Sequence, residues 1–370
     1  MVANHQRAAI ERAVDALKRW HVTADAPVVR RGLRVHSFLS LAPCPIRRAR
    51  IRTQPRRTKQ LYRRVTWPPT QTKDEPLTPS SAAAKPAAGF GAPFAALVAG
   101  ALAMGASPIF VRLADVGPFA SAFWRVALAL PALWVWLRFS DARAPSAGGF
   151  DRVGLLAGLA FTGDLFFWHL SIVTTSVANA TFFATTAPIW VVAFGWLLLG
   201  ERAAWRTLAG IALCVLGGAS LLAQSFHLRP AGAIGDLYGA ATGLFFGLYF
   251  LAVKAARRAH SAARVTFTAT LVTAVLLLIV ALALEPTILP HSLGGIAALC
   301  AMAWISHAGG QGLLSIALGR LPAAFSSLVI FLEAIAAAGF AFLFLGEPVS
   351  LVQAIGGLAI LAGIFVARPR

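Results

Sequence analysis

Long apolar stretches separated by short polar turns dominate the chain from Pro93 onward. Ten of them are each about 17–25 residues long, the length that a helix needs to cross the hydrocarbon core of a bilayer. The expected limits are 93–112, 118–138, 153–172, 176–199, 204–223, 233–253, 265–285, 293–316, 323–345 and 350–367. The connection at 172–176 is so short that spans three and four must form a tight hairpin. The pattern predicts an all-α polytopic membrane protein with ten transmembrane helices.

One pattern occurs twice among these stretches. The segment 185–222 matches the segment 331–368 at a displacement of 146 positions, and in both a long apolar helix ends at Gly-Glu before a second, glycine-containing helix. Ten spans in two copies give five spans per copy. Because five is odd, the second copy must cross the membrane in the opposite sense. The sequence therefore predicts two inverted five-helix repeats, at 91–223 and 233–368.

The composition agrees with a membrane protein and separates a basic tail from the spans. The chain is 58% hydrophobic and 13% charged, against about 25% charged in soluble domains. Of its 33 Lys and Arg residues 18 lie in residues 1–90, with 5 of its 14 Asp and Glu. The net charge of +19 therefore comes mainly from this tail, and it does not indicate a nucleic-acid partner.

We expect the tail, residues 1–90, to be disordered, because it lacks a long apolar run and ends in a proline-rich linker. Three interpretations remain open. The tail is a cytoplasmic basic arm that touches anionic lipid, an organelle-targeting segment, or the product of a start codon assigned too early. We favour the last, since the arginine-rich part shows no sustained periodicity.

Lys and Arg placement orients the spans. With the tail in the cytoplasm, twelve basic residues near the span ends face the cytoplasm and two, Arg112 and Arg229, face outward. We therefore expect a multi-pass protein of a bacterial-type inner or plasma membrane with both termini in the cytoplasm. Glu201 would then lie at the cytoplasmic end of span four, and Glu347 at the outer end of span nine.

Polar side chains inside the spans are the candidates for substrate binding or coupling, because an ionisable group at membrane depth costs about 2.5–3.5 kcal/mol. Asp164 and Trp168 share a helix face, as do His307 and Gln311, because each pair is four residues apart. The full set of candidates is Arg125, Asp164, Trp168, His169, Asn179, His307, Gln311 and Glu333.

Structural interpretations of the same residues stay open. Asp164 with Arg125 would make a structural ion pair, Glu333 would be a buried neutral carboxyl, and the histidines would be hydrogen-bonded interior side chains. For the two Gly-Glu corners, the structural interpretation is the favoured one: each Glu satisfies backbone groups or pairs with a nearby Arg where a helix ends. These corner residues are Gly200, Glu201, Gly346 and Glu347.

No catalytic or cofactor motif accompanies the candidates. The chain has no GxxxxGK[ST], HExxH or GxSxG motif, and its three cysteines match neither a disulfide framework nor a metal spacing. We therefore expect a protein that is not an enzyme, with no catalytic residues, no cofactor and no metal. Two rival functions are a membrane sensor or scaffold subunit without transport, and an intramembrane enzyme built on Asp164, His307 and Glu333.

The ten-span plan with two Gly-Glu hairpins resembles the EamA-type permeases of the drug/metabolite transporter superfamily. The first repeat is similar at FFWHLSIVTTSVANATFFATTAPIWVVAFGWLLLGE (166–201), and the second at GQGLLSIALGRLPAAFSSLVIFLEAIAAAGFAFLFLGE (310–347). The arginine in FWRVALAL also looks like a family position. Pro188 predicts a kink in span four. Family members often have Glu-Pro in span nine, where this chain has Glu333-Ala334, so the sequence offers no ground for a kink there.

The resemblance implies a permease or exporter of amino acids, other small metabolites or drugs. Such a protein would work by alternating access, with its cavity between the two repeats, and proton coupling is one way to drive it. The partners implied are a small-molecule substrate and the lipid bilayer, with a homodimer as an open alternative and no nucleic acid.

The start of the chain gives the first prediction. If the start codon is assigned too early, N-terminal sequencing of protein purified from its native cell will begin near the proline-rich linker, beyond the arginine-rich part. A protein that begins at Met1 would contradict this interpretation.

Overall fold

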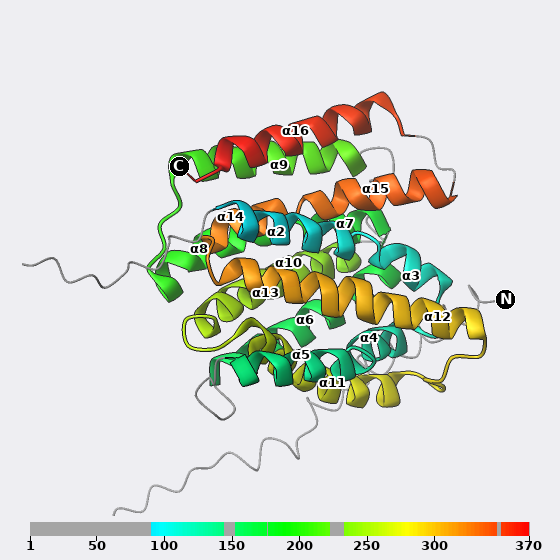
Figure 1. The fold of residues 1–370 in the computed structure, drawn as a ribbon. Coiled ribbons are helices and arrows are strands. Elements are labelled where there is room, and N and C mark those ends of the chain that lie inside the picture. Colours follow the sequence, from blue (N-terminus) through cyan, green and yellow to red (C-terminus); the bar gives the residue numbers. More distant parts are fainter. Residues whose placement is uncertain (1–89, 144–151, 176, 223–232, 346–348, 370) are drawn as a thin grey trace, which may run out of the picture. The chain divides into compact units, whose positions relative to one another are not determined.

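A computed structural model of the chain describes residues 90–143, 152–175, 177–222, 233–345 and 349–369, and all of them fall within one compact unit (Figure 1). Every regular element among the described residues is a helix. The predicted tail lies outside the described residues except for Phe90, and so do the corner residues Gly346 and Glu347.

Ten spans account for these helices. Eight segments of the described chain are long and apolar enough to cross a membrane, and two shorter apolar helices, Trp205–Ser220 and Leu351–Ala367, complete the ten. The prediction of a ten-helix membrane protein is confirmed.

In chain order, spans one to five are α2 (Gly91–Met104) with α3 (Ser107–Leu113), α4 (Pro118–Ala127) with α5 (Leu130–Arg143), α6 (Arg152–Thr174), α7 (Val177–Ala184) with α8 (Ala187–Leu199), and α9 (Trp205–Leu222). Spans six to ten are α10 (Ala233–Ala256), α11 (Ala262–Leu284), α12 (Leu293–Ala301) with the π-helix η3 (Met302–Gln311) and α13 (Gly312–Leu318), α14 (Ala323–Val329) with α15 (Leu332–Leu345), and α16 (Leu351–Ala367).

Three spans are broken into two helices just before a proline. Pro108, Pro131 and Pro188 each occupy the second position of the following helix, α3, α5 and α8. Proline lacks the backbone N–H that a helix interior needs, but it fits the first turn, where that N–H has no intrahelical partner. The kink predicted at Pro188 is therefore present, as a full break in span four.

Span nine is also broken, although no proline stands there. The N–H groups of Ile330 and Phe331 donate to the carbonyls three residues earlier, at 3.3 and 3.1 Å, which is the pattern of a tight turn. The break coincides with a close approach of span one: a β-carbon added at Gly105 would lie 2.8 Å from the carbonyl oxygen of Glu333. The break in span nine, which no proline in the sequence predicts, therefore lies where span one packs against it.

The fifth helices of the two repeats, α9 and α16, pack side by side (Figure 1). A β-carbon at Gly210 would lie 2.5 Å from the carbonyl oxygen of Gly363, and one at Gly217 would lie 2.5 Å from that of Gly356. Gly356 lies 146 positions after Gly210, and Gly363 lies 146 positions after Gly217, so each is the repeat-equivalent of the other. Each contact is therefore the repeat-equivalent of the other, as at a two-fold symmetric interface.

The centre of this interface confirms the symmetry. The Cys214 thiol lies 3.4 Å from the carbonyl oxygen of Ile360, which is its own equivalent 146 positions later. Contacts move towards the start of α16 as they move towards the end of α9, so the two helices run antiparallel. Equivalent helices that run antiparallel belong to inverted repeats.

A second pair of similar contacts joins each repeat to the other, although the two glycines are 142 rather than 146 positions apart. Gly105 of span one approaches Glu333 and Ala336, and Gly247 of span six approaches Ala187 and Trp190. The contacted residues are again 146 positions apart. The first span of each repeat therefore packs on the fourth span of the other, and the repeats interlock.

The α9–α16 contact gives the second prediction. Gly363→Ala would place a β-carbon 2.6 Å from the Cys214 sulfur, so we expect a loss of about 1–3 kcal/mol in unfolding free energy from overpacking. Gly357→Ala on the same helix meets nothing within 4 Å and serves as the control. We expect this control to be neutral or to gain about 0.5–1 kcal/mol, since alanine favours the helix. Thermal unfolding in detergent measures both, and equal effects would contradict the close packing.

Candidate functional site

A cavity of about 70 Å³ lies at mid-depth in the bundle, between the two repeats. Five of the eight candidate residues line it: Arg125, Asp164, Trp168, Gln311 and Glu333. They come from four spans, two and three in the first repeat and eight and nine in the second, so the fold brings together side chains that lie far apart in the sequence.

Irregular backbone borders this cavity on several sides. Its lining includes Ser107 after the break in span one, Thr185 at the break in span four and Ile330 at the break in span nine. Gln311, the last residue of the π-helix, also lines it. Backbone that departs from the α-helix at membrane depth is tolerated only where protein or a polar cavity replaces the lost hydrogen bonds. The breaks and the cavity are thus parts of one arrangement.

One cation and two carboxyl groups face this cavity. Arg125 of α4 and Asp164 of α6 are each 7% exposed, and Glu333 lies in the first turn of α15. In the part of the chain that the structure describes, no hydrogen bond or ion pair joins Arg125 to either carboxyl group. The structural ion pair between Asp164 and Arg125 is therefore not formed, and the three groups interact across the cavity.

Several polar atoms of the lining have no protein partner among the described residues. They include Arg125 Nε, Gln311 Oε1 and Ser107 Oγ. Gln311 uses its amide nitrogen towards the Met104 sulfur, at 3.2 Å. Buried polar groups are almost always hydrogen-bonded, so these atoms indicate a site for water or a polar solute.

Ser107 and Thr185 are lining residues that the sequence reasoning missed. Placing a hydroxyl in an apolar span costs little free energy and adds no charge. A serine or threonine there is therefore not conspicuous in the sequence. The available signal was position, because Ser107 directly precedes Pro108 and Thr185 lies three residues before Pro188.

The remaining candidates do not line the cavity. His169 Nδ1 donates to the Leu165 carbonyl at 2.7 Å, and a hydrogen bond of 2.9 Å joins His307 Nε2 to Thr270 Oγ1. Both rings are buried, as the structural interpretation of interior histidines expects. Asn179 belongs to α7, and its side chain is outside the described part. Gln311 lines the cavity, whereas His307 on the same π-helix does not.

Hydrogen-bonded carboxylates, called clasps here, join the two repeats at the end of the bundle where α4 begins. Glu285, after α11, accepts hydrogen bonds from the N–H groups of Phe119 and Ala120 at 2.7 and 3.1 Å, at the start of α4. Burial raises the pKa of Glu285, and these two hydrogen bonds oppose that rise. Asp115 accepts from the His291 N–H at 2.9 Å. Each clasp joins one repeat to the other.

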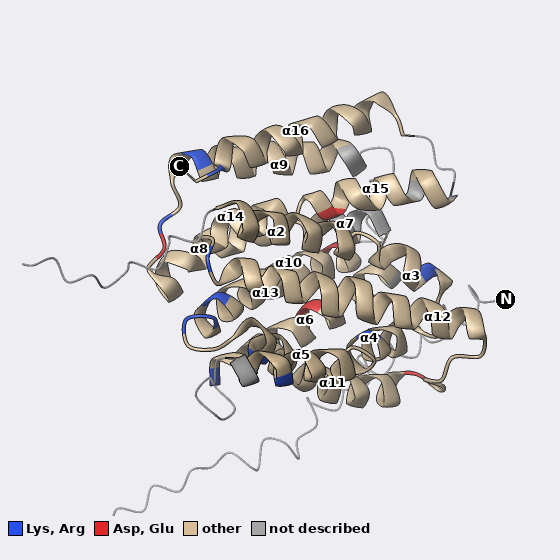
Figure 2. Ribbon diagram, viewed as in Figure 1, with Lys and Arg blue, Asp and Glu red and all other residues tan. Residues whose placement is uncertain are grey.

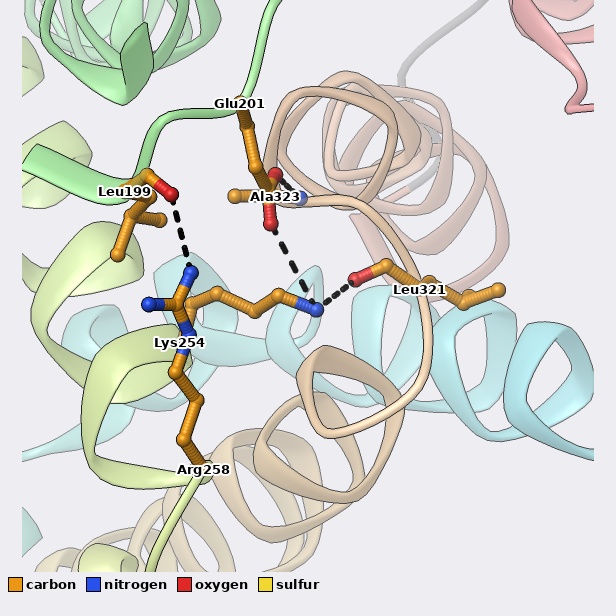
Figure 3. A network of polar contacts seen from close by, with 6 residues as sticks. All are labelled: Leu199, Glu201, Lys254, Arg258, Leu321 and Ala323. Atoms are coloured by element: carbon orange, nitrogen blue, oxygen red, sulfur yellow. Dashed lines mark hydrogen bonds and ion pairs between the residues drawn. The ribbon is translucent and has the colours of Figure 1, made fainter. Parts of the chain in front are cut away.

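A third clasp lies at the opposite end, beside the Gly-Glu corner of the first repeat (Figure 3). Gly200 ends α8 with a φ of 70°, a conformation that glycine adopts without strain. Glu201 then accepts from the N–H of Ala323, the first residue of α14, at 3.0 Å, and lies 3.9 Å from Lys254 Nζ. Lys254 also donates to the Leu321 carbonyl at 2.8 Å. The corner glutamate therefore joins span four to spans six and nine, with a lysine rather than an arginine as its partner.

Comparison with known proteins assigns the chain to a family. The EamA-like transporter family matches residues 91–223 and 233–368, and the chain belongs to this family. It is therefore an integral, multi-pass membrane transporter.

The relatives agree with this assignment. An uncharacterized transporter of Archaeoglobus fulgidus is 27% identical over 292 residues, which are 74% of this chain and 95% of that protein. An uncharacterized transporter of Methanothermobacter thermautotrophicus is 26% identical over 201 residues, which are 52% of this chain and 57% of that protein. A solved crystal structure shares the fold with a TM-score of 0.67 at 19% identity, and the match covers 75% of this chain and 98% of that one.

The shared cavity gives the third prediction. Arg125→Met leaves the cavity carboxyl groups without their cation, so we expect a loss of about 3–5 kcal/mol in stability at neutral pH. Asp164→Asn in the same protein should restore part of it, with a coupling energy of about 0.5–3 kcal/mol. Thermal unfolding of the wild type, both single variants and the double variant measures the coupling. Strictly additive effects would show that the two groups do not share a site.

Proposed function

We propose that the protein is a secondary transporter that carries a small organic solute by alternating access and couples its movement to protons. The observation that carries the proposal is one cavity, between inverted repeats, in which Arg125 faces both Asp164 and Glu333. Inverted repeats give two related packings of one bundle, and each packing opens the shared cavity to a different side.

The cavity is too small in this state for a drug-sized solute. Its volume is about 70 Å³, whereas pockets that bind small ligands enclose roughly 300–1,000 Å³. The clasps at both ends join the repeats in this state. Solute binding therefore requires a clasp to open and the repeats to separate, and the broken spans supply places where half-helices can tilt.

The charges in the cavity support proton coupling. One guanidinium balances one carboxylate, and a second carboxylate without a counter-ion is costly at membrane depth. A proton or a cationic solute group can supply the missing charge, and the two would then compete for one place. Competition of this kind is a direct means of exchanging a solute for a proton.

The lining also limits the chemical class of the solute. Trp168, Phe161 and Phe246 provide aromatic walls beside the charged groups. A small metabolite with an amino group, a carboxyl group and an apolar part would find a partner for each, so we propose an amino acid or a related compound.

The distribution of basic residues supports the proposed orientation (Figure 2). Lys and Arg gather at the end of the bundle where α16 ends, whereas α3 carries Arg112 at the opposite end. Under the positive-inside rule the basic end faces the cytoplasm, which puts the C-terminus there. Ten crossings put the start of the first span on the same side.

Proton coupling gives the fourth prediction. Asp164→Asn or Glu333→Gln should abolish the uptake of isotope-labelled amino acids that a pH gradient drives into vesicles, because each removes a titratable group from the cavity. The control is Asp236→Asn, which lies outside the cavity and keeps an oxygen to accept from Thr175 Oγ1.

Size-exclusion profiles and unfolding temperatures show whether the variants remain folded. Proton-driven uptake that is unchanged in both cavity variants would refute the coupling. Loss of uptake in the Asp236→Asn control would show that the assay reports folding rather than the cavity.

A further inference from the structure

A second, larger cavity lies at the basic end of the bundle, away from the central site. It encloses about 590 Å³ between α8, α9, α14 and the end of α16. One acidic residue lines it, Glu201, against five basic residues, which are Arg202, Arg206, Lys254, Arg320 and Arg368. The cavity therefore carries a positive charge that its own lining does not balance.

The acidic residue of this cavity is already engaged. Glu201 accepts from the Ala323 N–H at 3.0 Å and lies 3.9 Å from Lys254. Three of the arginines lie over aromatic rings. Arg202 is 6.0 Å from the Trp196 ring, Arg206 5.7 Å from the Trp205 ring and Arg368 4.9 Å from the Phe90 ring. Such contacts hold a guanidinium in place without neutralising it. The arginines are thus positioned for an anion that comes from outside the bundle.

An apolar groove continues from this cavity. The groove shares Arg206, Arg368 and Pro369 with the cavity, and its other walls include Phe90, Trp205 and Phe365. Trp205 is 71% exposed and Phe365 is 75% exposed, so in the membrane these rings face lipid. A basic cavity with an aromatic groove at its mouth matches a molecule that has an anionic head and an apolar chain.

We propose that this cavity binds an anionic phospholipid, with the phosphate among the arginines and one acyl chain along the groove. The arginine fork pairs with phosphate or carboxylate oxygens in a bidentate manner, and phosphate is the anionic group in the head of a phospholipid. The basic end of the bundle places the site in the cytoplasmic leaflet, where anionic lipids attract basic residues. The tail is excluded as an occupant, because residues 1–90 carry 18 basic and 5 acidic residues and are repelled by the same charge. The site is independent of the solute that the central cavity carries.

Native mass spectrometry of the delipidated full chain tests the proposal. The probes are phosphatidylglycerol, phosphatidylcholine and glycerol 3-phosphate, which separate an anionic lipid from a zwitterionic lipid and from a free phosphate compound. The test variant is Arg206→Gln with Arg368→Gln, which removes both arginines shared by cavity and groove. The matched control is Arg138→Gln with Arg152→Gln, which removes two exposed arginines outside the cavity.

The expected result is preferential binding of phosphatidylglycerol, which weakens about 20-fold in the test variant and stays within about two-fold in the control, since each basic residue near an anionic headgroup contributes a factor of roughly five. Arg206→Lys with Arg368→Lys keeps both charges and should keep most of the binding, which separates lost charge from lost folding. Equal weakening in the control variant would overturn the proposal, as would equal binding of phosphatidylcholine. Binding of glycerol 3-phosphate as tight as that of the lipid would show a soluble phosphate site instead.

Discussion

A backbone that leaves the helix inside a membrane must find new partners for its N–H and C=O groups, because hydrocarbon offers none and each unpaired group costs several kcal/mol. Four spans and a π-helix of this chain depart from the α-helix at membrane depth. The breaks in spans one, four and nine and the end of the π-helix border a polar cavity, and neighbouring spans pack against them. The position of the cavity is thus a consequence of where the spans break, and the rest of the arrangement has to bring the breaks together.

The two inverted repeats bring the helix breaks together with few contacts. The glycine pairs of α9 and α16 allow the fifth helices to approach around a pseudo-two-fold axis, and Gly105 and Gly247 seat each first span on the fourth span of the other repeat. Since lipid gives no hydrophobic drive between helices, close packing of small residues carries most of the association. The carboxylate clasps lie at the two ends of the same interface, so the contacts that hold the repeats together are also those that must change when the cavity opens.

Much of this arrangement could be predicted from the sequence. The spans followed from apolar length, and the inversion followed from an odd number of spans per repeat, both of which are one-dimensional properties. Five of the eight candidate residues line the cavity, and three of these are ionisable groups, whose charge at membrane depth is costly anywhere except at such a site. The histidines were misleading for the same reason, since a buried ring that bonds to Leu165 or Thr270 resembles a functional one in sequence.

Other features depend on contacts between distant segments and could not be predicted. The break in span nine has no proline and accompanies the approach of Gly105, and the π-helix leaves no mark in the apolar pattern. The clasp at Glu201 was expected as a local corner, but its partners lie in spans six and nine.

The inversion of the two repeats is the claim on which the rest of this account depends, and one labelling experiment tests it. Trp205 and Leu351 begin α9 and α16, are 71% and 77% exposed, and are repeat-equivalents 146 positions apart. Each is replaced by cysteine in a protein without Cys44, Cys214 and Cys300, and intact cells are treated with a membrane-impermeant maleimide. The account predicts that the cysteine at position 351 is labelled from outside, and that the one at position 205 is labelled only after the membrane is permeabilised. Labelling of both from the same side would contradict it.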